Sequence, residues 1–126
     1  MKKYITTLSK LFDIRQLIAN NGILDLAFSR KAGLSVARNI KKIDNELAEY
    51  DKSRDELIRK YSDNGVTMNR SNPNWNEFIK EFNEIGSVEA SLEINMITDD
   101  DLPENITPSA CMAIEFMIED PVEIVE

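Results

Sequence analysis

The residues that could do chemistry in this chain are few, and an acidic run holds the closest group of them. Asp99, Asp100 and Asp101 are consecutive, and Glu104 follows within the stretch TDDDLPEN. Neighbouring carboxylates could bind a divalent cation, but a calcium loop alternates its ligands with other residues and needs a glycine at its turn. This run has neither feature. We therefore interpret it as a solvated acidic loop and predict no metal site.

Other groups that enzymes use are also scarce. The chain has no histidine, which removes the commonest general base, proton shuttle and metal ligand. Its four glycines are isolated, so no glycine-rich loop could hold a phosphate. The single cysteine, Cys111, lies in an apolar stretch, where we predict a buried and unreactive thiol. These features favour a protein that is not an enzyme and needs no cofactor.

Charge divides unevenly along the chain, although the net charge is −8. Residues 1–62 hold 13 Lys or Arg and 8 Asp or Glu, a balance of +5. Residues 63–126 hold 2 and 15, a balance of −13, and no basic residue follows Lys80. Either the two halves neutralise each other within the fold, or the acidic half forms a surface for a basic partner. Net negative charge disfavours direct binding of nucleic acid, because it repels phosphate.

Length and composition indicate a single domain over 1–126, with 42% hydrophobic and 30% charged residues, as in folded helix-rich proteins. No apolar run is long enough to span a bilayer, and the first residues lack the apolar core of a secretory signal. A lone cysteine excludes an internal disulfide and favours a reducing compartment. We therefore predict a cytoplasmic protein without membrane contact.

The spacing of apolar residues predicts a mainly α protein with a small β element (α+β). Within the first part, 1–33, we expect a helix over about 4–19. The stretch ILDLAF at 23–28 alternates apolar residues and predicts either a short strand or an extended connection.

A long central helix and a second helix should form an antiparallel hairpin over 34–86. The long helix, about 34–61, repeats apolar residues every three or four positions. These heptad positions are Val36, Ile40, Ile43, Leu47, Tyr50, Arg54, Leu57 and Tyr61. Because Arg54 and two tyrosines interrupt them, we predict packing within the chain, against the helix at about 75–85 and the N-terminal helix. The acidic residues of the long helix predict exposed pairs with lysine and arginine one turn away: Glu46, Glu49, Asp51, Asp55 and Glu56.

The last part, 87–126, begins with a change of period from helical to two, which predicts a half-buried strand at 88–96. Such a strand must pair with another. The internal candidates are 23–28 and the tail VEIVE at 122–126; otherwise its edge is open to another chain.

A C-terminal apolar helix should follow at 107–119, with Thr107 as its N-cap and Pro108 as its first residue. Only Glu115 interrupts its apolar surface, so we predict a helix buried on more than one side or docked on another molecule. Pro121 would end it.

Two stretches also carry a family resemblance. The long helix opens with Ala37, Arg38 and Asn39 and continues with ELxxY, and the last helix reads ITPSACMAIEFM. Over 34–119 these features resemble an uncharacterised family of small proteins encoded by phages and prophages of Gram-positive bacteria, although Gly33 and Leu34 depart from its regular helix start. The resemblance implies an accessory protein in the host cytoplasm that acts by binding. We expect Asn39 to form a structural hydrogen bond across the hairpin, ahead of any contact with a partner.

We therefore expect a phage-encoded, non-enzymatic protein that binds a host or phage protein, and inhibition of a host defence system is the favoured role. The alternatives are a self-associating virion or tail-assembly protein, forming a homo-oligomer, and a protein that sequesters a small ligand among Lys and Arg of the first half. The predicted partner-binding residues are Glu89, Glu93, Asp99, Asp100, Asp101, Glu104, Met112, Phe116 and Glu119.

Overall fold

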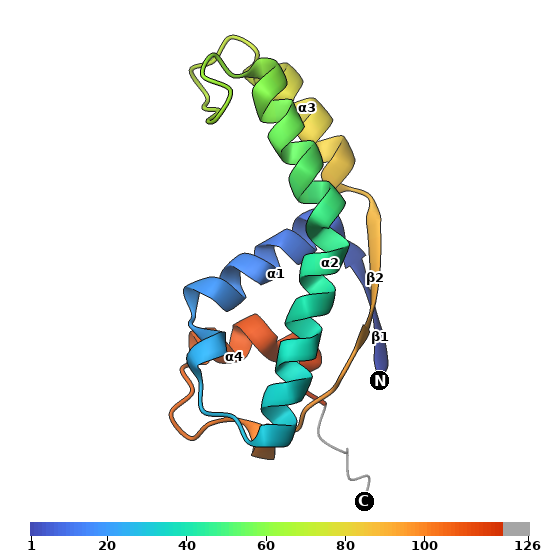
Figure 1. The fold of residues 1–126 in the computed structure, drawn as a ribbon, viewed down its shortest axis with the longest axis vertical. Coiled ribbons are helices and arrows are strands. Elements are labelled where there is room, and N and C mark those ends of the chain that lie inside the picture. Colours follow the sequence, from blue (N-terminus) through green and yellow to red (C-terminus); the bar gives the residue numbers. More distant parts are fainter. Residues whose placement is uncertain (120–126) are drawn as a thin grey trace, which may run out of the picture.

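The computed structural model describes residues 1–119, and it confirms a mainly helical fold with one small antiparallel sheet (Figure 1). The elements in chain order are β1 (Lys2–Thr7), α1 (Leu8–Asn20), α2 (Arg30–Tyr61), α3 (Trp75–Gly86), β2 (Glu89–Ile94) and α4 (Pro108–Ile114). Short 3-10 turns lie at Ile23–Asp25, Asp99–Asp101 and Glu115–Met117. None of the helices in this part of the chain is long and apolar enough to cross a membrane.

The long helix α2 organises the fold. It begins at Arg30, four residues before the predicted start, because the Ser29 hydroxyl accepts a hydrogen bond from the Ala32 N–H at 3.3 Å and caps the helix there. Its heptad positions as far as Tyr50 are buried except for the half-buried Ile40, and Arg54, Leu57 and Tyr61 are half-buried. Figure 1 shows why: the lower half contacts several elements, whereas only α3 covers the upper half.

The predicted helical hairpin is confirmed, since α3 returns antiparallel along the upper half of α2 (Figure 1). A continuous row of aromatic rings joins the two helices to α1, with neighbouring centroids 5.7 to 5.8 Å apart: Trp75, Phe78, Phe82, Tyr50 and Phe12. Aromatic pairs at this separation add stability beyond the area they bury. The prediction that α2 packs within its own chain, against α1 and α3, is therefore also confirmed.

The sheet corrects the prediction for the N-terminus. Residues 4–7, predicted as the start of a helix, belong to strand β1, and α1 begins only at Leu8. The stretch YITT contains three β-branched residues, which favour extended backbone. Thr7 then ends the strand and caps α1, its hydroxyl accepting from the Lys10 N–H at 3.4 Å.

β1 is also the strand that pairs with β2, with Tyr4 opposite Leu92. Neither predicted partner does so within the described chain: 23–28 forms a 3-10 turn followed by a connection, and the tail at 122–126 lies outside the described residues. The alternation predicted for β2 is confirmed, because Ala90, Leu92 and Ile94 are buried and the residues between them are exposed.

Asn39 is a fully buried polar residue of the core. Its amide group donates to the Asn95 C=O and accepts from the Asn95 N–H, both at 2.8 Å. The expected structural role is therefore observed, but the partner is the segment that follows β2, not the other arm of the hairpin. This contact fixes where the chain leaves the sheet on its way to the acidic loop.

The C-terminal helix is shorter than predicted. Thr107 caps it and Pro108 opens it as expected, but α4 ends at Ile114 and a 3-10 turn follows. Ile118 then forms a parallel bridge with Ile97, which requires extended backbone and so ends the helical region before 119. The predicted stop at Pro121 lies outside the described residues.

Candidate functional site

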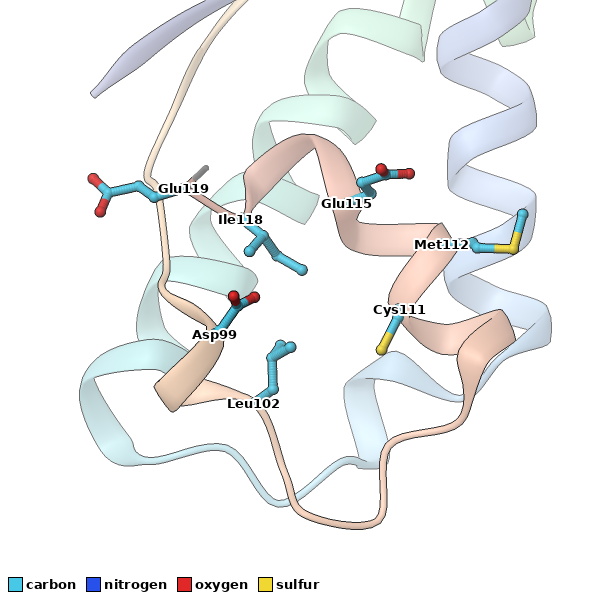
Figure 2. A pocket seen from close by; sticks show the side chains of 7 residues that line it. All are labelled: Asp99, Leu102, Cys111, Met112, Glu115, Ile118 and Glu119. Atoms are coloured by element: carbon cyan, nitrogen blue, oxygen red, sulfur yellow. The ribbon is translucent and has the colours of Figure 1, made fainter. Parts of the chain in front are cut away.

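A hollow of about 360 Å³ lies between the last helix and the acidic loop (Figure 2). Ligand-binding pockets usually have volumes of about 300–1,000 Å³, so this hollow could accept a side chain or a small group. The residues that line it are Asp99, Leu102, Cys111, Met112, Glu115, Ile118 and Glu119. In Figure 2, Leu102, Cys111 and Ile118 surround the central space, whereas the side chains of Met112 and Glu119 extend away from it on opposite sides.

Backbone hydrogen bonds hold the two walls of the hollow together. The Ile97 N–H donates to the Met117 C=O at 2.8 Å, and the Glu119 N–H donates to the Ile97 C=O at 2.7 Å. The acidic loop is shaped by Thr98 and Asp101: the Asp101 carboxylate accepts from the Thr98 N–H at 2.9 Å and from its hydroxyl at 3.1 Å. The walls are thus built by main-chain bonds and a capping box, which leave the remaining side chains free to face outward.

The helix α4 presents two different faces to this region. Ala110, Ala113 and Ile114 are buried against the core, whereas Met112 on the other side is 71% exposed. This division explains why the sequence of this helix is apolar on nearly all sides. One face is core, and the other lines the hollow together with Glu115, the single acidic residue of the pattern.

The chemistry of the hollow is apolar at its centre and acidic at its rim. Its apolar lining comes from Leu102, Met112 and Ile118, and its three carboxylates come from other positions: Asp99, Glu115 and Glu119. No lysine or arginine is among its lining residues. Such a surface suits a ligand that combines an apolar group with positive charge.

Three of the predicted partner-binding residues line this hollow, namely Asp99, Met112 and Glu119. Asp100 and Glu104 are exposed on the same loop but are not among the residues that line it. The prediction and the hollow thus share these three residues, and whether they bind a partner stays a prediction.

The remaining predicted residues lie elsewhere. Asp101 bonds to Thr98, and Phe116 is half-buried against Tyr4 with ring centroids 5.3 Å apart, so both have structural contacts. Glu89 and Glu93 are exposed on the outer face of the sheet. The nine predicted residues thus do not form one site.

Four lining residues were not predicted: Leu102, Cys111, Glu115 and Ile118. Glu115 did leave a signal, because it is the one acidic interruption of an apolar helix. Cys111 was predicted to be buried, but it is only half-buried, and Figure 2 shows its sulfur directed toward the hollow. The reason is that α4 is short, with one face left uncovered.

No metal centre is formed by the described residues 1–119, because no three or more of their Cys, Asp and Glu side chains are grouped closely enough to hold an ion. The consecutive aspartates of the loop make different contacts: the Asp101 carboxylate accepts a hydrogen bond from Thr98 in the capping box, and Asp99 lines the hollow.

A second charged cluster, on α1 and α2, has a structural role. Both oxygens of the Asp51 carboxylate accept from Arg15, each at 2.7 Å, and the Arg15 and Arg54 guanidinium groups each lie 5.2 Å from the centroid of the Phe12 ring. Asp51 was predicted to form an exposed pair one turn away within α2. Arg54 of α2 does lie 3.9 Å from its carboxylate, but Asp51 is half-buried and its shorter contact is with Arg15 of α1. The Arg15 hydrogen bonds lower the pKa of the Asp51 carboxyl, and the same contact raises the pKa of Arg15.

Fold and site together define a small, mainly helical α+β protein with an acid-rimmed apolar hollow. No family model, curated protein or solved structure matches the chain. The resemblance to phage-encoded proteins therefore stays a prediction, and the residues themselves must carry the functional argument.

Proposed function

We propose that this protein acts by binding another protein, without chemical turnover, and that the hollow receives an apolar side chain flanked by lysine or arginine. The observation that supports this most is the composition of the hollow, with apolar residues at its centre and three carboxylates among its lining residues. An apolar anchor supplies binding energy, and complementary charge supplies orientation and a faster association rate.

Lack of internal pairing strengthens the charge argument. Within the described residues 1–119, the ion pairs involve carboxylates of α2 and α3, and Asp99, Glu115 and Glu119 take part in none of them. Exposed carboxylates that are not neutralised within the chain repel one another, and a cationic partner relieves this repulsion.

The hollow gives less support to sequestration of a small anionic ligand. That role requires a pocket lined by Lys and Arg of the first half, whereas the acid-rimmed hollow is built from 99–119. For the biological setting we propose a phage-encoded accessory protein with a host defence protein as the favoured target. A target that binds nucleic acid would present a basic surface of the kind that the acid-rimmed hollow suits.

The test uses a peptide probe with one leucine flanked on each side by two lysines, labelled for fluorescence anisotropy. The unmodified protein should bind this probe, and binding should weaken as salt is raised. The double variant Asp99→Lys/Glu119→Lys should bind it at least about tenfold less tightly. Glu104→Lys is the matched control, because it reverses an exposed charge on the same loop outside the hollow.

Equal binding by the double variant and the control would refute the hollow as the site. The biological role has a separate test. Expression of the chain in a Gram-positive host should restore plaque formation by a phage that a host defence system blocks, and the double variant should not restore it.

A further inference from the structure

The outer edge of β1 is open in the described part of the chain. The sheet has two strands, and β1 pairs only with β2. An unpaired strand edge carries main-chain donors and acceptors that can add a further strand. Which residues carry these free groups follows from the pairing register.

In an antiparallel pair, residues that exchange both main-chain hydrogen bonds alternate with residues that exchange none. The Leu8 N–H donates to the Val88 C=O at 2.9 Å, so the even-numbered residues of β1 are the ones bonded to β2. The odd-numbered residues Lys3 and Ile5 therefore point their N–H and C=O groups away from β2, toward the open edge.

The other edge of the sheet, on β2, is in contact with the long helix α2. Glu93 lies opposite Lys3, so its C=O points outward from β2, and there it accepts a hydrogen bond from Lys42 of α2 at 2.6 Å. Asn39 of the same helix holds Asn95 just beyond the strand. The long helix thus occupies the end of the β2 edge, at Glu93 and Asn95, whereas no hydrogen bond from another described element reaches the outward main-chain groups of β1 at Lys3 and Ile5.

The exposed side chains of β1 suit a second copy of the same edge. Ile5 is 56% exposed, and its neighbours on that face are Lys3 and Thr7. A two-fold axis at Ile5 places the two Ile5 side chains opposite each other and each Lys3 opposite Thr7 of the other copy. The two Lys3 charges then lie far apart. A two-fold axis at Tyr4 would instead place each Lys3 opposite Ile5 of the other copy and bring the two lysines closer together.

Charge also agrees with this register. Thr7 pairs with Glu89, and Lys3 pairs with Glu93. One row across the joined sheet would therefore run Glu93, Lys3, Thr7 and Glu89, so each lysine lies between carboxylates of the two copies. The charge attraction that dimerisation adds is therefore between Lys3 and Glu89 of the other copy, which lies one strand beyond Thr7, at two strand spacings or ~10 Å.

We propose that β1 pairs antiparallel with β1 of a second copy of this chain, about a two-fold axis at Ile5, to form a four-stranded sheet. Each Ile5 N–H donates to the Ile5 C=O of the other copy, and Thr7 N–H groups donate to Lys3 C=O groups. This surface is separate from the acid-rimmed hollow, so the dimer does not depend on the function proposed above.

Light scattering coupled to size exclusion tests the proposal. The protein should show twice its chain mass of 14.4 kDa. Ile5→Pro removes an N–H that points away from β2, so it should restore the single-chain mass while the far-ultraviolet circular dichroism stays unchanged. Ile5→Lys should do the same by placing two like charges opposite each other. Leu24→Lys, which also replaces an exposed apolar residue, is the control and should remain dimeric.

Cysteine cross-linking tests the register. In a Cys111→Ser background, Ile5→Cys should form a disulfide-linked dimer on oxidation, because paired Cα atoms at such a position lie about 5.5 Å apart. Lys3→Cys in the same background should not, because its two copies would be roughly 14 Å apart.

Several results would overturn the proposal. A single-chain mass at every concentration is one, and a dimer that survives both Ile5→Pro and Ile5→Lys is another.

Discussion

Polar side chains of the helical core are paired within the fold, whereas, in the described part of the chain, the carboxylates of the acid-rimmed hollow are not. On α2, Asn39 and Asp51 each bind a partner through two short hydrogen bonds. At the hollow, Asp99, Glu115 and Glu119 form no ion pair with another described residue. Polar groups that are satisfied within the fold contribute to its stability, whereas those left unsatisfied at a surface are available to another molecule. The difference separates the residues that hold the protein together from those that we propose to bind.

The largest expected loss of stability comes from removing the hydrogen bonds of Asn39 in the helical core. Asn39→Ala should lower the free energy of unfolding by about 3 kcal/mol, because it leaves the Asn95 N–H and C=O without partners and opens a small cavity. Urea denaturation measures the change. Asn45→Ala, at an exposed position of the same helix, is the control and should change stability by less than about 0.5 kcal/mol. An equal loss of stability in both variants would show that the hydrogen bonds of Asn39 to Asn95 do not stabilise the fold.

A smaller loss is expected at Asp51. Asp51→Asn keeps the size of the side chain but removes the charge that Arg15 binds, and it should cost about 1 kcal/mol, because the pair is partly exposed to solvent. Asp44→Asn is the matched control, since Asp44 lies 3.9 Å from the same guanidinium group and is 57% exposed. We expect a cost close to zero for the control, and thermal unfolding of the two variants side by side provides the measurement.

The same pair should give stability a pH dependence in the acid range. Arg15 lowers the pKa of the Asp51 carboxyl below its ordinary value of 3.8, so the folded state binds the proton less readily than the unfolded state. The contribution of the pair is therefore complete above that value and is lost as pH falls through the lowered pKa. The stability difference between the unmodified protein and Asp51→Asn should shrink when denaturation at about pH 3 is compared with pH 7. A constant difference would contradict the assignment.

Sequence alone predicts much of the helical core and little of the hollow, because the core elements have a local pattern and the hollow depends on contacts between distant residues. Helix α2, the hairpin and β2 follow from local periodicity, which a single stretch of residues reveals. Strand β1 was missed because Ile5, Leu8 and Leu11 also fit a helical spacing, and only pairing with β2 decides between the two. The hollow depends on a bridge between Ile97 and Ile118, which no local pattern announces.

That dependence on distant contacts also explains the mixed result for the partner-binding residues. Composition singled out Asp99, Met112 and Glu119, which the structure places on the lining of the hollow. They could not show that Phe116 packs on Tyr4, or that Asp101 is occupied by Thr98. Composition identifies residues that can meet a partner, and the tertiary contacts then decide which of them are already engaged within the chain.

The smallest expected effect on stability lies on the unpaired side of the comparison. Glu119→Gln and Asp99→Asn should each change the free energy of unfolding by less than about 0.5 kcal/mol, because neither carboxylate has an ion pair to lose among the described residues. Removing one of several neighbouring negative charges could even raise stability at low salt, since like charges repel. Affinity for the lysine-flanked leucine peptide should nevertheless fall in both variants. Stability and binding would then respond in opposite ways at the two regions: Asp51→Asn should weaken the fold and leave peptide binding unchanged. Should Glu119→Gln or Asp99→Asn instead destabilise the protein as much as Asp51→Asn does, these carboxylates would belong to the folded framework, and the hollow would lose its claim to be the binding surface.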